Sequence, residues 1–568
     1  MAKSVILGLN SSGYNTSSAL VIDGEAVFAV EEERLIREKR TRRFPIEGIR
    51  EGLKMAGLSF EELDSVAIAW NPAINLEAFS NPQSLRARYL GEFFYSVPNY
   101  LMTLKRDSSA LISQQILDFI DGTRLKIYYV MHHLAHASSF FFSPFERAAI
   151  MTIDAFGEKH SVLFAEGEGN SLRIMWSQEF PHSLGSFYAA MTEFMGFQPD
   201  SDEWKVMGAS SYGNPDRYYD RLRSIVHLED EGGFELDLSH FNHYQFHRPL
   251  MYSPKLCELL SLQPNSRDQP LTQEYYDLAA AVQRITEDVY FHLLNQLYDR
   301  TGLDKVVLAG GVVYNSVANG KILKRTPFRQ VFIPPAPDDS GGSLGAAFYV
   351  YHHLMQQPRN YVMTSNYLGP GYGDDEIVAL LERYRLKHVV IDDPARIAAE
   401  LIASNKIIGW FQGRLEFGDR ALGNRSILAD PRDASMKDRV NETVKYREPF
   451  RPFAPSILLE YMEDYFLDAE PAPFMEKVFP IRLEKRSVLP AVTHVDGSGR
   501  LQTVSRDQNQ LYWRLIDEFR KLTGIPVVLN TSFNLKGEPI VCSPKDAVRT
   551  FFSSGLDALI IGNCLVEK

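Results

Sequence analysis

The stretch VILGLNSSGYNTSSALVIDGEAVFAV, residues 5–30, contains three short apolar runs separated by small and polar residues. The first run ends at Asn10, and the pair Asp23–Gly24 between the second and third runs is a strong signal for a tight β-hairpin. We therefore expect three strands, at residues 5–9, 18–22 and 26–30. Residues 46–55, with apolar side chains at helical spacing ahead of Gly57, should form a helix.

The same pattern returns further along the chain. Residues 148–153 form an apolar run that ends at Asp154, and residues 161–165 and 172–176 indicate two more strands with a turn at 166–169 between them. Two copies of strand, small-residue turn, strand, tight turn and strand indicate a duplicated unit. Such duplication is typical of actin-like ATPase folds, whose two halves close on a nucleotide, although β-rich repeats also arise by chance in α/β proteins.

The remaining elements extend this α/β pattern. A helix is expected at 273–301, followed by a strand at 305–309 that runs into Gly310 and Gly311; such glycines can admit a phosphate or ribose, or simply make a tight turn. Asp338 and Asp339 precede a helix at 343–354, either as N-caps or as ligands. Residues 356–373 lack periodicity and are expected to be a linker. Beyond them, apolar runs at 406–411, 526–530 and 558–561 indicate a second α/β domain.

Composition limits the class of protein. The 568 residues are 45% hydrophobic and 23% charged, which is ordinary for a globular protein of two or three domains. A net charge of −12 disfavours nucleic-acid partners, because phosphate neutralisation calls for basic residues. Three scattered cysteines fit a reducing compartment. The sequence shows neither a signal peptide nor an apolar run long enough for a membrane span, so we expect a cytoplasmic protein.

Two histidines have the spacing of metal ligands. His132 and His136 stand at i and i+4, so on a helix both imidazoles would share one face. The glutamate of a zinc protease motif is missing, and the spacing also occurs by chance. Asp339 could add an oxygen ligand. Two nitrogens and one carboxylate would suit iron, manganese or zinc.

The segment with the most candidate binding residues runs from residue 409 to residue 455. Its arginines stand among glycine, phenylalanine and proline, and the prolines at 449, 452 and 455 forbid a regular helix. Rigid loops that present guanidinium groups match the oxygens of a phosphate, so we favour an anion pocket over a solvated, salt-bridged face. Near the C-terminus, Asn530 and Ser532 follow an apolar strand, where they would bind an amide or a phosphate or close a turn.

Together these segments resemble the NodU-type O-carbamoyltransferases, a family whose members carbamoylate nodulation factors, cephalosporins and tobramycin. The segments that carry the resemblance are Ile6–Asn10, Glu31–Arg34, His132–His136, Gly310–Val312, residues 409–455 and Asn530–Asn534. The resemblance implies a duplicated actin-like (ASKHA) domain at 1–355, a linker at 356–373 and a YrdC-like α/β domain at 374–568.

The resemblance also implies a two-step reaction. The YrdC-like domain would form carbamoyl adenylate from carbamoyl phosphate and ATP, with Mg²⁺ accompanying the ATP and pyrophosphate released. The actin-like domain would then transfer the carbamoyl group to a hydroxyl or amine of a small-molecule acceptor, as a step of natural-product or antibiotic biosynthesis. A divalent metal, with Fe²⁺ expected, would assist the transfer, and a homodimer is left open.

Site residues follow from the family motifs. The implied metal ligands are His132, His136 and Asp339; the implied nucleotide contacts are Asn10, Asp154, Gly310, Gly311 and Asn315; carbamoyl phosphate and ATP would be held by Arg420, Lys445, Arg451, Arg500, Asn530 and Ser532; and Tyr14, Asn15 and Lys39 would be catalytic. One departure stands out, because the family usually has His-Asp where this chain has Tyr14 and Asn15. Another group then deprotonates the acceptor, or the acceptor is an amine, or transfer has been altered.

Two other functions remain open at this point. The tRNA threonylcarbamoylation enzymes share the expected fold, but the negative charge and the fused second domain disfavour that function. A nucleotide-binding sensor or scaffold without transfer activity is supported only by the change at Tyr14 and Asn15.

Overall fold

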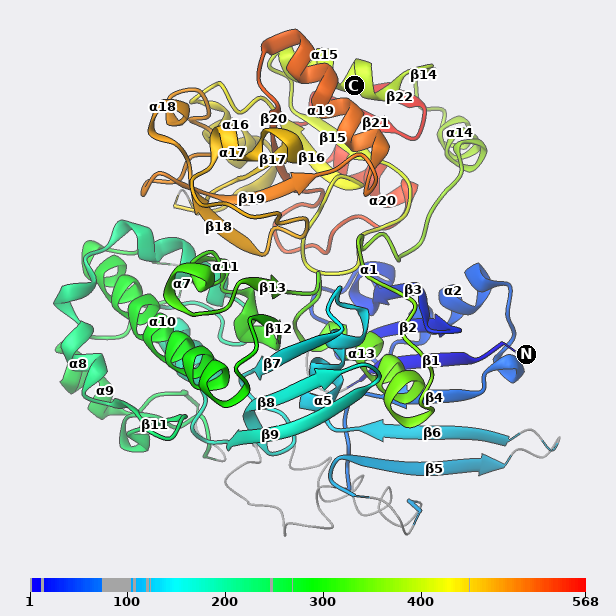
Figure 1. Cartoon of the computed structure of the whole chain (residues 1–568). Helices are drawn as coiled ribbons and strands as arrows, with labels where there is room; N and C mark the ends of the chain where they lie inside the picture. The colour runs from blue at the N-terminus through cyan, green and yellow to red at the C-terminus, as the bar shows by residue number, and fades with distance from the viewer. Residues whose placement is uncertain are drawn as a thin grey trace. The chain divides into compact units, whose positions relative to one another are not determined.

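The computed structural model describes residues 3–11, 15–73, 104–105, 109–118, 122, 124–245, 249–267, 269–448 and 450–568. The chain divides into two compact units, the first made of residues 1–27 and 56–363 and the second of residues 28–55 and 364–568. The break at 363 falls inside the segment expected to be a linker, which forms no helix or named strand (Figure 1). Residues 28–55, by contrast, group with the second unit although they lie near the N-terminus.

The first sheet has the strand order β3-β2-β1-β4-β6-β5. Its strands are β1 (Val5–Asn10), β2 (Ser17–Ile22), β3 (Glu25–Glu31), β4 (Ser65–Ile68), β5 (Ile112–Asp118) and β6 (Arg124–Val130). β1 runs antiparallel to β2 and parallel to β4, and every residue of it is buried. Asp23 and Gly24 both adopt positive φ in the β2–β3 turn, as a type I′ hairpin requires, so the expected hairpin is confirmed.

The second sheet repeats this topology in the order β13-β12-β7-β8-β9. Its strands are β7 (Arg147–Ile153), β8 (His160–Glu168), β9 (Ser171–Glu179), β12 (Lys305–Ala309) and β13 (Gln330–Phe332). β7 is antiparallel to β8 and parallel to β12, as β1 is to β2 and β4. The duplicated, actin-like unit predicted from the sequence is therefore confirmed.

One predicted turn in this sheet is wrong in its position. β8 continues through Glu168, and the chain reverses at Gly169, which has a φ of 56°. Gly167 pairs with Ala148 and Leu172 within the sheet, and the Phe140 ring packs on it so closely that a Cβ there would lie 2.6 Å from ring atoms. The glycine that looked like a turn residue thus serves packing.

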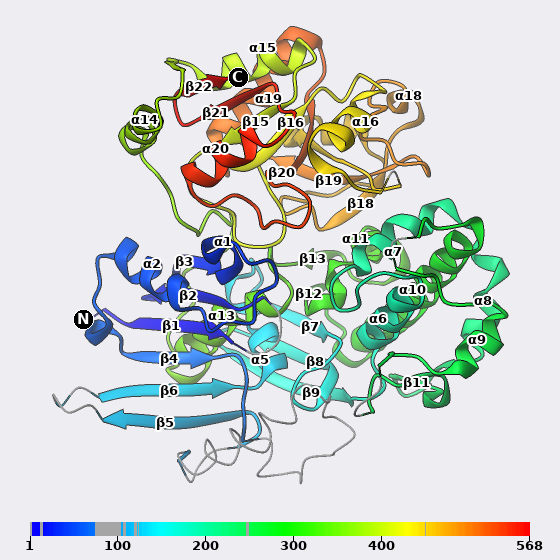
Figure 2. The same ribbon diagram turned by 180° about the vertical axis from the view of Figure 1, so that it is seen from behind.

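Two short helices lie between the sheets in both views of the ribbon (Figures 1 and 2). α13 (Gly342–Phe348) packs on β1, β2 and β4, and α5 (His132–Ala137) packs on β7, β8 and β12 as well as on α13. The two helices cross so closely that a Cβ on Gly345 would lie 1.8 Å from the carbonyl oxygen of Ala135. The predicted helix at 343–354 continues as the π-helical segment η11 (Tyr349–Leu354). α5 is thereby held in the core of the first unit.

A helical layer accompanies the second sheet. It contains α6 (Leu184–Phe194), α7 (Glu203–Ala209), α8 (Tyr219–Arg223), α9 (Pro254–Leu260), α10 (Gln273–Thr301), α11 (Ser316–Asn319) and α12 (Ile322–Arg325), with the hairpin β10 (Val226–Leu228) and β11 (Phe234–Leu236). α10 has the predicted bounds and ends at Gly302, whose left-handed backbone caps it. Among the described helices of the chain, none is both long and apolar enough to cross a membrane.

The second unit is built on a mixed sheet with the order β14-β22-β21-β15-β16-β20-β17-β19-β18. Its strands are β14 (His388–Val390), β15 (Ile408–Phe411), β16 (Arg425–Ala429), β17 (Ala454–Leu458), β18 (Lys477–Pro480), β19 (Ser498–Val504), β20 (Val527–Ser532), β21 (Ala558–Ile561) and β22 (Cys564–Glu567). The α/β class is confirmed, and the three strands predicted in this half are present. The likeness to the YrdC fold stays a prediction.

Helices cover both faces of this sheet. α15 (Pro394–Ala403) and α19 (Gln510–Thr523) pack on the face that carries Ile408 and Trp410. α14 (Asp374–Arg383), α16 (Met436–Val440) and α20 (Pro544–Phe552) supply the core on the face that carries Phe411. Alternate residues of one strand thus enter two cores, as the pleat requires.

Contacts with the later part of the chain explain why residues 28–55 group with the second unit. This segment contains the end of β3, α1 (Glu32–Ile36) and most of α2 (Ile46–Ala56). The Ala29 N–H donates to the carbonyl of Leu368 at 3.2 Å. The Arg37 guanidinium donates to the carbonyl oxygens of Pro539 and Ile540. These bonds fasten the segment at two separate places.

Candidate functional sites

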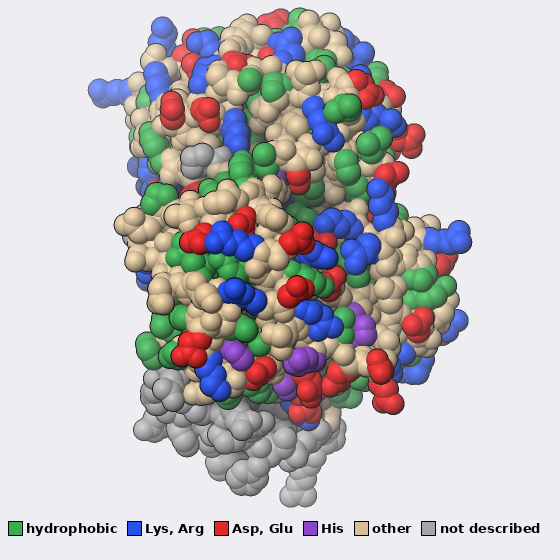
Figure 3. Space-filling view, turned by 90° about the vertical axis from the view of Figure 1, so that its left-hand side faces the viewer, with side chains coloured by type: hydrophobic (Ala, Val, Ile, Leu, Met, Phe, Trp, Pro, Cys, Tyr) green, Lys and Arg blue, Asp and Glu red, His purple; other side chains and the backbone are tan. Residues whose placement is uncertain are grey.

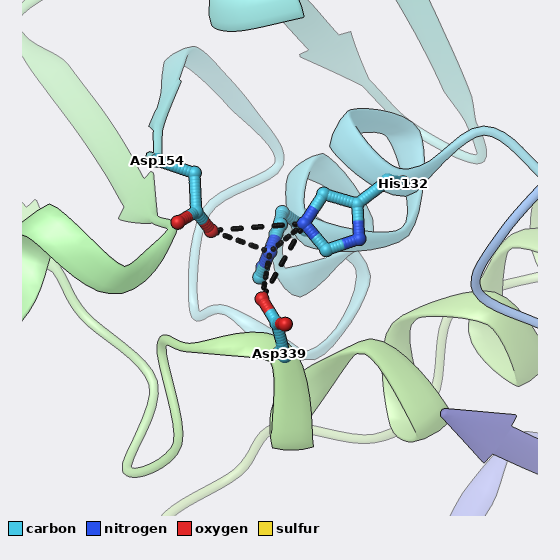
Figure 4. Close-up of side chains that lie close together, drawn as sticks. His132, Asp154 and Asp339 are labelled. Carbon is cyan, nitrogen blue, oxygen red and sulfur yellow. Dashed lines mark hydrogen bonds and ion pairs between the residues drawn. The ribbon is translucent and has the colours of Figure 1, made fainter. Parts of the chain in front are cut away.

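Two histidines and two aspartates meet in the core of the first unit. His132 and His136 stand one turn apart on α5, and their Nε2 atoms lie 3.0 Å apart. Asp154 follows the last residue of β7, and Asp339 opens the short 3-10 turn ahead of α13. Figure 4 shows His132, Asp154 and Asp339 pointing toward one another from three segments that are distant in the sequence. Strand and helix ends of the duplicated fold thus bring them together.

The spacing of their ligand atoms suits one metal ion. Asp154 Oδ2 lies 3.3 Å from His136 Nε2 and 3.6 Å from His132 Nε2, and Asp339 Oδ1 lies 3.5 Å from His132 Nε2. All four atoms lie within 4.8 Å of one another. Ligands held about 2.0–2.2 Å from one ion are separated by roughly 3–4 Å. Two imidazole nitrogens and two carboxylate oxygens are a chemically suitable set for a divalent transition metal.

Asp154 joins this cluster, although the sequence alone placed it among the nucleotide contacts. The signal was present in its position: Asp154 ends β7 as Asn10 ends β1, and such strand ends line the site of a duplicated fold. Asp338, the alternative to Asp339, points elsewhere. Its Oδ2 accepts a hydrogen bond from the Asn15 side chain at 2.9 Å.

The charges of the four clustered side chains favour binding of a cation. Burial disfavours ionisation of Asp339 and raises its pKa well above its ordinary value. Burial acts on Asp154 in the same direction, but hydrogen bonds from His132 and His136 outweigh it and bring the pKa of Asp154 well below its ordinary value. The pKa of His132 rises to about 9 in spite of burial because of Asp154 and Asp339. The carboxylates of Asp154 and Asp339, 11% and 28% exposed, are therefore partly balanced by a proton, and a metal cation would balance them more fully.

Neighbouring groups fix the start of α5. The buried carboxylate of Glu158 accepts the backbone N–H of His132 at 2.9 Å and that of Asn71 at 2.7 Å. His133 turns away from the cluster, with its Nδ1 2.6 Å from Thr152 Oγ1. Partners of this kind orient a ligand helix and are typical around metal sites.

The residues expected to contact a nucleotide lie beside this cluster. The Gly311 N–H donates to Asp154 Oδ2 at 3.1 Å. Gly310 has a φ of 102°, and a Cβ there would lie 2.1 Å from the carbonyl oxygen of Ile153, so only glycine fits this turn. The Asn315 side chain exchanges two hydrogen bonds with Gln283, at 2.9 and 3.0 Å, and also caps α11. The glycines thus adjoin the cluster, whereas the amide of Asn315 is engaged within the protein.

The residues expected to be catalytic are not all found together. Asn15 has a left-handed φ of 56°, its backbone oxygen accepts from Asn10, and its Oδ1 is buried with no hydrogen-bond partner among the described residues. Tyr14 lies outside the described residues. Lys39 belongs to the segment 28–55 and therefore to the second unit.

In the second unit, a buried donor and a buried acceptor flank the start of β17. Ala454 lies opposite Asn530 of β20, and the register of Ser456 with Gln502 places Arg500 of β19 level with Ala454 on its other side. The Asn530 amide donates to Gln502 at 2.9 Å. Its Oδ1 and the Nε of Arg500 are buried without a partner among the described residues. Orphaned groups of this kind require a ligand or a water.

Positive charges gather around this position, and we call Arg420, Lys445, Arg447, Arg451 and Arg500 the cationic cluster. Burial lowers the pKa of Arg500 well below its ordinary value, and Arg420, Arg447 and Arg451 lower it further. Burial likewise lowers the pKa of Lys445, helped by Arg447, Arg451 and Lys39. A bound anion would relieve both desolvation and mutual repulsion.

Lys445 and Ser532 are in direct contact. Lys445 Nζ donates to Ser532 Oγ at 3.2 Å and to Asn534 Oδ1 at 2.8 Å. Lys445 ends a π-helical turn, η12 (Asn441–Lys445), and Tyr446 after it has a left-handed φ of 45°. This turn directs Lys445 into the unit while Tyr446 stays exposed. Arg447 was not expected in this cluster from the sequence. The signal was its position two residues after Lys445, with only Tyr446 between them.

Other arginines of the 409–455 run are structural. Arg425 is fully buried, lies 3.7 Å over the Phe411 ring and donates to the carbonyl oxygens of Gln412 and Asn424. Arg414 donates to the carbonyl oxygen of Gly369 at 2.9 Å. Neither lies on a solvated, salt-bridged face. On the molecular face drawn in Figure 3, acidic and basic side chains are intermingled without a broad field of one sign.

Comparisons with known proteins cover nearly the whole chain. A model of the carbamoyltransferase N-terminus matches residues 5–348, and a model of the carbamoyltransferase C-terminus matches residues 399–568. An uncharacterised protein of Synechocystis is 38% identical over 601 residues, covering 99% of this chain and 96% of its own length. Nodulation protein NolNO of Sinorhizobium fredii is 40% identical over 566 residues, covering 98% of this chain and 80% of its own.

Similarity to solved structures is more distant. Component A of the (R)-2-hydroxyglutaryl-CoA dehydratase of Acidaminococcus fermentans is 13% identical with a TM-score of 0.34, covering 62% of this chain and 100% of its own. The repeated strand order of the first unit, rather than this similarity, identifies the duplicated fold.

Proposed function

This chain belongs to the carbamoyltransferase family, and from that premise we propose that it activates a carbamoyl group with ATP in its second unit and transfers it in its first. The acceptor is a hydroxyl or an amine of a small molecule. The observation that carries the proposal is the cationic cluster around two orphaned buried atoms, Asn530 Oδ1 and Arg500 Nε.

Those two atoms match the chemistry of the carbamoyl donor. Carbamoyl phosphate carries an amino group, whose N–H can donate a hydrogen bond to an amide oxygen, and an anionic phosphate, which a guanidinium can bind. Water first hydrolyses carbamoyl phosphate, which releases phosphate and leaves carbamate. A carbamate oxygen then attacks the α-phosphorus of ATP, which enters with Mg²⁺, and pyrophosphate leaves. The cationic cluster would offset the charge that grows on the phosphates in this step.

In the second step the acceptor's oxygen or nitrogen attacks the carbamoyl carbon of the adenylate, AMP leaves and the acceptor loses its proton. We assign this step to the cluster of His132, His136, Asp154 and Asp339. A metal bound there would supply a positive charge that polarises the carbamoyl carbonyl. Fe²⁺ is the ion expected from the family resemblance, and the donor set also suits manganese or zinc. The carboxylate of Glu158 would hold the start of α5 in place through the His132 N–H. Gly311, whose N–H reaches Asp154, would let the transferred group approach closely.

The acceptor class follows from two observations. The relative NolNO is named as a nodulation protein, which favours a small-molecule acceptor over tRNA. Where the family usually has His-Asp, this chain has Tyr14, which lies outside the described residues, followed by Asn15, whose amide is bound to Asp338. Neither a phenol nor an amide is a ready base at neutral pH, so an amine acceptor or a base from elsewhere fits this turn.

The test is pyrophosphate release from ATP with labelled carbamoyl phosphate and a panel of alcohols and amines, followed by mass spectrometry. We expect release that depends on carbamoyl phosphate and falls at least about 100-fold in Arg500→Ala, because a charge-assisted contact in the transition state is lost. Arg514→Ala is the matched control, since Arg514 of α19 forms a partly exposed ion pair with Asp393, the N-cap of α15. ATP binding without release would instead indicate a sensor.

A further inference from the structure

The loop that carries Arg420 is folded around one carboxylate. Glu416 is buried, and its Oε1 accepts the backbone N–H groups of Leu422, Asn424 and Arg425 at 2.8, 2.8 and 3.1 Å. The loop between residues 416 and 425 is therefore closed on itself. Arg420 stands at its middle.

Two sets of hydrogen bonds hold the backbone on either side of Arg420. On the C-terminal side, the Asn530 amide donates to the carbonyl of Ala421 at 3.1 Å. On the N-terminal side, the Gly418 N–H donates to Glu31 Oε1 at 2.7 Å, and the Gly418 carbonyl accepts from Arg34 at 3.1 Å. Gly418 has a φ of 111°, a conformation that residues other than glycine rarely adopt. The backbone of Gly418 is thus held through both its N–H and its carbonyl oxygen.

The groups that hold Gly418 form a buried charged network. Arg34 lies 3.0 Å from Glu33 Oε1 and 3.5 Å from Glu31 Oε2, and all three residues are less than 5% exposed. Asp419 Oδ1 is 3.9 Å from Arg34. Removing ions from water is costly, so a buried network of this kind contributes little to net stability and is better explained by the geometry it fixes.

We propose that Glu31 and Arg34 are positioning residues that set Arg420 in the cationic cluster, so that the segment 28–55 takes part in the activation step. The inference rests on the proposed function, because it concerns how that site binds phosphate. Glu31 and Arg34 do not bind the substrate; they act through the Gly418 peptide, two residues before Arg420. A guanidinium held in advance gives up less freedom when the anion binds.

The segment offers its own control for a merely mechanical role. Arg37 also belongs to residues 28–55 and also donates to backbone carbonyls of the second unit, but those of Pro539 and Ile540. If the segment only needs to be fastened, Arg37→Ala and Arg34→Ala should have similar effects. If Arg34 positions Arg420, only Arg34→Ala should change anion binding through Arg420.

The experiment is a double-mutant cycle in the full-length protein. Binding of inorganic phosphate is measured by calorimetry, and the KM for carbamoyl phosphate by pyrophosphate release, in Glu31→Ala, Arg34→Ala, Arg420→Ala and the double variants. Arg420→Ala should weaken phosphate binding about 10- to 100-fold, the usual loss for one charged hydrogen-bonded contact. Glu31→Ala should reproduce most of this loss, and adding it to Arg420→Ala should change binding less than about twofold.

Two further variants separate positioning from misfolding. Glu31→Gln keeps an oxygen that can accept the Gly418 N–H and should restore most of the phosphate affinity. Gly418→Ala strains the same turn without touching the segment and should behave like Glu31→Ala. Penalties that multiply in the double variants, or equal effects of Arg37→Ala, would overturn the inference while leaving the proposed function intact. A wild-type protein that neither binds phosphate nor releases pyrophosphate would overturn both.

Discussion

Replacing Asp154 by asparagine should abolish metal binding at the cluster of the first unit without unfolding that unit. Asparagine keeps the size of the side chain but replaces a carboxylate that lies 3.3 Å from His136 Nε2 and 3.6 Å from His132 Nε2. The loss of one partner behind a ligand typically costs 10- to 100-fold in metal affinity. Loss of a ligand itself should therefore cost at least about 100-fold, or about 2.7 kcal/mol.

The assay is metal content after dialysis, together with the melting temperature with and without added Fe²⁺, Mn²⁺ or Zn²⁺. At about 100 times its dissociation constant, a metal stabilises the wild-type protein by about 2.7 kcal/mol, which raises the melting temperature by several degrees. Asp154→Asn should show almost no such rise. Asp338→Asn is the control, because the Asp338 carboxylate is adjacent but is held by Asn15 and Ser340.

The result that would refute this reasoning is an Asp154→Asn protein with unchanged metal content and unchanged affinity. His132, His136 and Asp339 would then suffice, as the sequence alone predicted. Asp154 would serve only to orient the histidines and the Gly311 N–H.

His136→Ala should abolish metal binding and carbamoyl transfer. It should leave the pyrophosphate release that depends on carbamoyl phosphate within about threefold of wild type, because the cationic cluster belongs to the other unit. Loss of both activities would show a structural role for His136. Arg425→Ala should lower the free energy of unfolding by about 3–5 kcal/mol in urea, since it leaves buried carbonyls unpaired, whereas Arg420→Ala should change it by less than about 1 kcal/mol. Burial raises the pKa of Glu476 from 4.5 to about 7, although Lys477 opposes this. Between these two pH values the Glu476 carboxyl is protonated in the folded chain and ionised in the unfolded chain. Wild-type stability should fall by up to about 3 kcal/mol as pH rises from about 4.5 through 7, and Glu476→Gln, measured in urea at pH 5 and pH 8, should escape that loss; equal pH dependence in both proteins would contradict the assignment.

The secondary structure was largely predictable because its signals are local. Asp23–Gly24 can make only a few kinds of turn, and the bounds of the helix at 273–301 follow from its apolar spacing and from Gly302. The duplicated strand order was likewise predictable from two similar runs of sequence. Gly167 was misread, because its role depends on the Phe140 ring, a contact that no local pattern reveals.

The site was predictable only in part. His132 and His136 lie on one helix, so their spacing places them together, but Asp154 joins them only through the pairing of strands. Arg425 and Arg500 look alike in the sequence. Only the fold shows that backbone carbonyls surround the first and that other cations surround the second. The grouping of residues 28–55 with the second unit depends on contacts with residues several hundred positions later, which sequence periodicity does not encode.

That grouping has a consequence for how the chain is made. Residues 28–55 leave the ribosome early, yet the residues they join begin at position 364, roughly 300 residues later. At about 5–20 residues per second, the early segment waits on the order of 15 to 60 seconds with its ionised side chains, Glu31 and Arg34 among them, still hydrated. The second unit can be completed only after the residues near position 568 have been made, so a nascent chain halted midway lacks most of this unit and exposes residues 28–55 to chaperones.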